Sequence, residues 1–138
     1  MRPILVGMNS NSTVAATHFP ARRTAWLATA AMCGLGALAW LLLGLFIEAR
    51  EAWDSTLYFL AVLPLSVVAG VIAGWRHGGP GWRWPLAYFG GQLLVIAPRW
   101  FQPGEGSLWP LALVFLFVCS LPCWLAAEFV IRVRERVR

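Results

Sequence analysis

The sequence predicts an all-α polytopic membrane protein, with four transmembrane helices packed in a compact bundle. Of its 138 residues, 59% are hydrophobic and 12% are charged, whereas a soluble domain carries about 25% charged residues. The apolar residues gather into long blocks, as a bilayer environment requires. Arginines cluster on one side of the resulting four-span arrangement, a bias typical of inner-membrane proteins.

The first predicted span covers about residues 24–47 and follows a polar tail, residues 1–21. Its 24 uncharged residues would form about 36 Å of helix, enough to cross the ~30 Å hydrocarbon core with some tilt. A cleaved signal peptide has a shorter apolar core of about 7–15 residues. We therefore expect an uncleaved first transmembrane helix.

The second predicted span covers about residues 55–75, after a short acidic segment that contains Glu48, Glu51 and Asp54. Pro64 lies inside this span and should kink it, because proline removes a helix hydrogen bond. A glycine-rich segment, residues 76–81, follows and predicts a tight turn.

The third predicted span, residues 84–98, is short. Its 15 uncharged residues would form roughly 22 Å of helix, less than the ~30 Å hydrocarbon core. It either crosses the bilayer with snorkelling end residues and local thinning, or forms a re-entrant element. A re-entrant element would place the basic C-terminus outside, so charge bias favours four full spans.

The fourth predicted span covers about residues 108–131, with a kink expected at Pro122, and a basic tail, residues 132–138, follows it. Together the spans form one transmembrane domain, residues 22–131. Nine of the eleven arginines then lie on the side of the two termini. This predicts cytoplasmic termini, and the absence of lysine hints at GC-rich bacterial coding and hence at a bacterial inner membrane.

The basic residues border the apolar blocks, so they indicate topology and lipid contact and argue against a nucleic-acid partner. The arginines expected at lipid headgroups are Arg22, Arg23, Arg83, Arg132, Arg134 and Arg136.

A stripe of small residues predicts a helix-packing interface on the second span. Ser66, Gly70 and Gly74 recur every four residues, and Ala69 and Ala73 flank them. Small residues let two membrane helices approach closely. The stripe either receives another protein or a second copy, or packs against another helix of the same chain.

Two polar side chains inside the apolar blocks are candidate substrate or ion contacts. Gln92 lies in the middle of the third span, and Glu128 lies near the inner end of the fourth. An interhelical hydrogen bond is the favoured explanation of Gln92, and an ion pair with Arg132, four residues on, would explain Glu128. Cys33, Cys119 and Cys123 predict buried thiols rather than a disulfide or a metal site.

No pattern in the sequence predicts catalysis, a cofactor or a metal, so we do not expect an enzyme. The expected function is a non-enzymatic accessory or scaffold subunit, with other membrane proteins or copies of itself as partners within the lipid bilayer. One alternative is a small oligomeric transporter or channel that uses Gln92 and Glu128. Another is a membrane-perturbing, holin-like protein.

Overall fold

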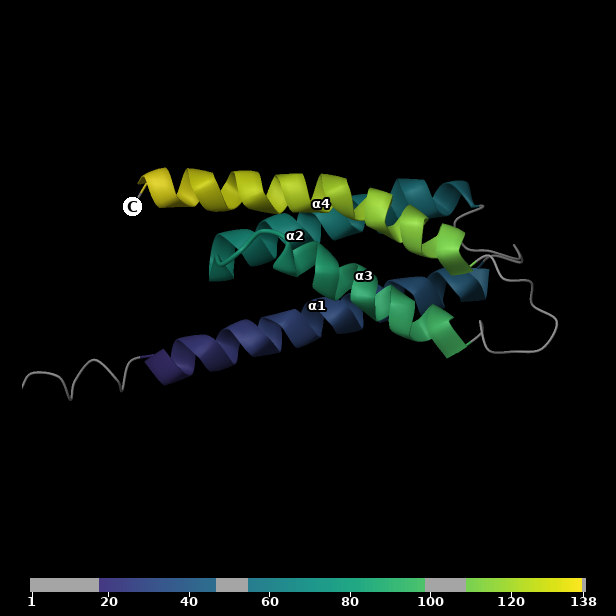
Figure 1. Ribbon diagram of the computed structural model, residues 1–138, viewed down its shortest axis with the longest axis horizontal. Coiled ribbons are helices and arrows are strands. Elements are labelled where there is room, and N and C mark those ends of the chain that lie inside the picture. Colours follow the sequence, from purple (N-terminus) through teal and green to yellow (C-terminus); the bar gives the residue numbers. More distant parts are fainter. Residues whose placement is uncertain (1–17, 47–54, 99–108, 138) are drawn as a thin grey trace, which may run out of the picture.

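The computed structural model describes residues 18–46, 55–98 and 109–137, and within them it is entirely helical (Figure 1). Residues 18–22 and Trp109 are described only as backbone. The elements are α1 (His18–Phe46), a π-helical turn η3 (Tyr58–Val62), α2 (Leu63–His77), α3 (Arg83–Ile96) and α4 (Trp109–Val137). The predicted all-α class is confirmed for this part of the chain.

Successive helices run in opposite directions along the long axis, so α1 begins at the end of the molecule where α4 finishes (Figure 1). The closest packing joins α1 to α3 and α2 to α4, and α3 and α4 share a smaller interface. The bundle is therefore built from two helix pairs, and neither pair joins neighbours in the sequence.

Three helical segments are long and apolar enough to cross a membrane: residues 23–46, 58–77 and 110–137. The molecule is thus suited to a bilayer. At 14 residues, α3 is about 21 Å long, so a full crossing by the predicted third span stays a prediction.

Two helices extend beyond their predicted apolar spans. The first begins at His18, inside the predicted polar tail, and α4 continues to Val137 through the basic tail. Apolar length marks the part of a helix that fits in hydrocarbon, whereas backbone hydrogen bonding continues in water. The fourth helix also runs continuously through Pro122.

Pro64 reshapes the start of the second helix into a wide turn. It has no backbone N–H, and its ring crowds the carbonyl four residues earlier. The N–H of Leu63 donates to the carbonyl of Tyr58, five residues back, which closes the π-helical turn η3. The distortion expected at Pro64 thus takes the form of a π turn. Such turns are rare in proteins, and many of them lie at functional sites.

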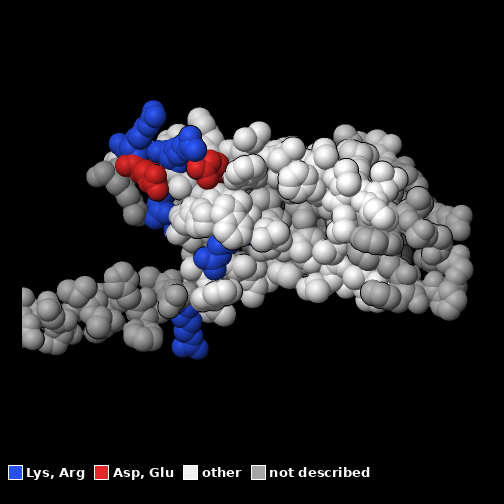
Figure 2. All heavy atoms as spheres, viewed as in Figure 1, with Lys and Arg blue, Asp and Glu red and all other residues white. Residues whose placement is uncertain are grey.

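The described charged residues gather at one end of the molecule, the end where α1 begins and α4 finishes (Figure 2). We call it the basic end. Its arginines are Arg23, Arg76, Arg83, Arg132, Arg134 and Arg136.

Candidate functional site: a buried polar cluster at the π turn

A set of fully buried polar side chains lies where η3, α2, α3 and α4 meet. Each of these side chains has a relative exposure of 0%, whereas many large apolar side chains of the same helices are exposed. We call this set the polar cluster: Tyr58, Ser66, Tyr88, Gln92 and Cys123.

Two tyrosines link the π turn to α3. The hydroxyl of Tyr58 donates to Oε1 of Gln92 at 3.0 Å, and the hydroxyl of Tyr88 donates to the carbonyl of Val62 at 3.2 Å. Residues inside a bilayer find no water to bond. These two bonds therefore fix how η3 and α3 sit against each other.

A second pair of bonds links α2 to α4. The thiol of Cys123 donates to the carbonyl of Ser66 at 3.1 Å, and the hydroxyl of Ser66 donates to the carbonyl of Leu63 at 2.6 Å. The Ser66 hydroxyl thus bonds back into its own helix, as serine often does in membrane helices. Cys123 is a structural donor here.

One donor in the polar cluster has no partner among the described residues. Nε2 of Gln92 is buried and unbonded, as is the indole Nε1 of Trp84. An unsatisfied buried donor costs about 1–3 kcal/mol, and such groups often mark a bound water or ligand. The Tyr88 hydroxyl lies beside this amide, so at least one N–H of Gln92 remains for an acceptor that reaches it.

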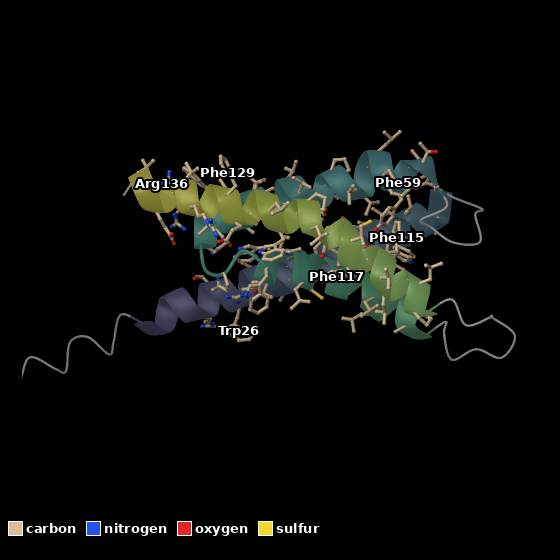
Figure 3. All side chains as sticks on the ribbon, turned by 45° about the horizontal axis from the view of Figure 1, so that its top comes forward. Trp26, Phe59, Phe115, Phe117, Phe129 and Arg136 are labelled. Atoms are coloured by element: carbon tan, nitrogen blue, oxygen red, sulfur yellow. The ribbon has the colours of Figure 1, made fainter. Side chains whose placement is uncertain are left out.

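Aromatic rings enclose the cluster on the side of η3. The ring of Tyr58 contacts those of Trp40, Phe59 and Phe115, with centroids 5.6–6.0 Å apart. Phe59 and Phe115 also meet edge to face at 5.9 Å, at the end of the bundle opposite Arg136 (Figure 3). These contacts belong to the packing that leaves Tyr58 fully buried.

The small-residue stripe packs against α4 of the same chain. A Cβ atom on Gly70 would lie 2.7 Å from Sγ of Cys123, and one on Gly74 would lie 3.2 Å from the carbonyl oxygen of Ala127. Ser66 and Ala73 are also buried, and Ala69 is half-buried. Of the two alternatives that the sequence left open, the structure therefore shows the second, in which the stripe packs against another helix of the same chain.

Glu128 forms the ion pair expected with Arg132, at 3.1 Å between Oε1 and Nε. Its other oxygen accepts a hydrogen bond from the backbone N–H of Gly81 at 3.2 Å, which ties the α2–α3 turn to α4. Gln92 instead accepts its hydrogen bond from the hydroxyl of Tyr58. The two candidate contact residues therefore have separate partners.

Arg83 differs from a free headgroup contact. Its guanidinium donates to Oγ1 of Thr29 at 2.8 Å and to the carbonyl of Ala25 at 2.9 Å, and it lies over the rings of Trp26 and Trp84 at 5.3 and 5.5 Å. It joins the start of α3 to α1. The sequence did not predict this inward direction of the Arg83 side chain, because an arginine at the end of a span usually extends outward to the headgroups.

The other predicted headgroup arginines vary in exposure. Arg23, Arg132 and Arg136 are exposed, and Arg134 is half-buried. The side chain of Arg22 lies outside the described residues.

The described residues interact through apolar packing, hydrogen bonds, cation–π contacts and the ion pair of Glu128 with Arg132. Among them, no group of three or more His, Cys, Asp or Glu side chains could hold a metal ion. The three cysteines are free thiols.

Sequence reasoning identified Gln92 but missed Tyr58 and Tyr88. Each tyrosine hydroxyl lies within an otherwise apolar helix, which was the available signal. The chain matches no protein-family model, no curated protein and no solved structure.

Proposed function

We propose that this chain is a non-enzymatic assembly subunit of a bacterial inner-membrane complex. In this proposal its four helices cross the bilayer and both termini lie in the cytoplasm. The basic end supports that orientation, since cytoplasmic segments carry the excess of arginine. The alternating helix directions support four crossings.

The observation that carries the proposal is an exposed small-residue face on α1. Ala30, Ala31 and Gly34 point away from the bundle, between the exposed side chains of Leu27 and Leu38. A Cβ atom on Gly34 would meet nothing within 4 Å. Unlike the stripe on α2, this face has no described helix against it.

The physical basis is the way helices associate in lipid. Hydrocarbon tails are as apolar as leucine, so close backbone approach and dispersion contacts drive association. Ala30 and Gly34 have the small-xxx-small spacing that permits such an approach. The partner would be an apolar helix of another membrane protein or α1 of a second copy.

The test compares Gly34→Leu with Gly44→Leu by native mass spectrometry of protein extracted gently from its own membranes. Gly44 is also exposed and open on α1 but lies about 15 Å further along the helix, beyond the small-residue face, so it is a matched control. We expect wild type and Gly44→Leu to remain in a defined complex, and Gly34→Leu to lose at least four-fifths of it. Equal assembly of all three would refute this interface.

A transporter or channel is the second candidate, and the unpartnered Nε2 of Gln92 is the observation that favours it. A buried amide donor can bind a passing polar solute. The test is solute or ion flux in proteoliposomes, with Tyr58→Phe and Gln92→Leu compared with wild type. Flux that Gln92→Leu abolishes would support transport, and the absence of flux in wild type would count against it.

A further inference from the structure

An open apolar groove runs between α3 and α4, the two helices that share the smaller interface. Its volume is about 320 Å³, near the lower end of the range for small-ligand pockets. The residues that define it are Trp82, Phe89 and Gly90 from α3 and the turn before it, and Phe117, Ser120 and Trp124 from α4.

The groove offers an occupant almost no polar contact. The hydroxyl of Ser120 donates to the carbonyl of Phe117 at 2.6 Å, so it is already bonded within α4. Gly90 has no side chain, so α3 leaves open space in the groove at this position. A Cβ atom there would meet nothing within 4 Å. The groove therefore fits an apolar chain that lies along the helices.

A cationic side chain stands beyond the end of the groove toward the basic end. Arg132 lies eleven residues after the groove residue Leu121, which is just over three helical turns and about 17 Å. Its side chain is 71% exposed and uses Nε in the ion pair with Glu128. This ion pair holds the guanidinium over Glu128, which lies one helical turn nearer the groove.

We propose that this groove binds one acyl chain of an anionic phospholipid, with the lipid phosphate at Arg132. The apolar walls match the acyl chain, and the guanidinium matches the phosphate, which arginine binds well. A partner helix suits the groove less, because an apolar helix would give the exposed guanidinium of Arg132 no anion to bind. This lipid site lies on a different face from Gly34 and does not depend on the proposed assembly.

The acyl-chain part of the proposal is tested by native mass spectrometry after reconstitution in phosphatidylglycerol vesicles. Gly90→Leu should fill the groove without a backbone clash, and Gly44→Leu makes the same change on an open face of α1. We expect one tightly retained lipid on wild type and Gly44→Leu, and at least a fivefold lower bound fraction on Gly90→Leu. Equal retention by Gly90→Leu and Gly44→Leu would overturn the site.

The headgroup part is tested by competition between phosphatidylglycerol and phosphatidylcholine of identical chains. Arg132→Gln should lower the preference for phosphatidylglycerol about fivefold, the effect of removing one arginine near an anionic headgroup. Arg136→Gln, an exposed arginine one turn on, is the control and should keep the preference. No preference in wild type, or a co-purified protein that Gly90→Leu releases in place of lipid, would overturn the proposal.

Discussion

Two adjacent glycines in α3 have opposite surroundings. A Cβ atom on Gly91 would overlap the backbone carbonyl of Cys33 in α1, whereas one on Gly90 would point into the open groove. Across the same contact, a Cβ atom on Gly36 would overlap the carbonyl of Tyr88. The two backbones thus touch at this crossing, and only glycine fits there.

This contrast predicts opposite effects of the same substitution. Gly91→Ala should destabilise the protein by about 1–3 kcal/mol or more, because the helices must move apart. Gly90→Ala should be neutral or stabilise it by up to about 1 kcal/mol, through better helix propensity. Reversible unfolding in mixed micelles, followed by circular dichroism, measures both, and equal destabilisation would contradict the close crossing.

The hydrogen bond between Tyr58 and Gln92 predicts energetic coupling between the two positions. Tyr58→Phe removes the donor and Gln92→Leu removes the acceptor of the 3.0 Å bond. A double-mutant cycle on unfolding free energy should give a coupling of about 0.6–2 kcal/mol, as for other membrane hydrogen bonds. A coupling near zero would show that the two side chains do not interact in the bilayer.

At this scale the sequence identified a polar residue but could not identify its partner. Gln92 stands out as an amide inside an apolar span. Its bond to Tyr58 joins positions 34 residues apart, and only the tertiary arrangement brings them together. The same is true of Arg83, whose partners in α1 lie 54 and 58 residues away.

Among the elements, the pairing of α2 with α4 depends on the small-residue stripe. The sequence predicts the stripe as a feature of the second span, because spacing by four defines one helix face. Spacing alone does not show what covers that face. In the structure it is α4, through Cys123 and Ala127.

The close approach of Gly70 to Cys123 predicts a compensating pair of substitutions. Gly70→Ala should destabilise the α2–α4 contact by about 1–3 kcal/mol, since its Cβ would lie 2.7 Å from the thiol sulfur. Cys123→Ala removes that sulfur and should restore part of the loss in the double variant. Unfolding in micelles measures the effect, and a simple sum of the two single effects would contradict the contact.

At the scale of the whole molecule, the helix directions predict where the C-terminus lies. If α3 crosses the bilayer, a reporter fused after Arg138 should be cytoplasmic, like one fused before Met1. A fluorescent protein and an alkaline phosphatase, each fused at both ends, measure this. A periplasmic C-terminus would mean that α3 is re-entrant.

Much of the architecture followed from composition and charge. Apolar length predicted the helices, and the arginine bias agrees with the basic end that the described arginines form. The pairing of α1 with α3 and of α2 with α4 did not follow, because the order of helices in the chain allows several neighbours and side-chain fit chooses among them. The lipid groove between α3 and α4 is a result of that pairing.

The π turn at residues 58–62 holds one residue more than an α-helical turn would need. An α-helix advances 100° per residue. The extra residue therefore rotates the residues that precede it in the chain by about 100° around the helix axis, relative to α2. Deleting one residue between 59 and 61 would let the helix close regularly and would carry Tyr58 away from Gln92. The extra residue therefore sets the direction of the Tyr58 side chain, and without it the polar cluster would lose its hydrogen bond to η3.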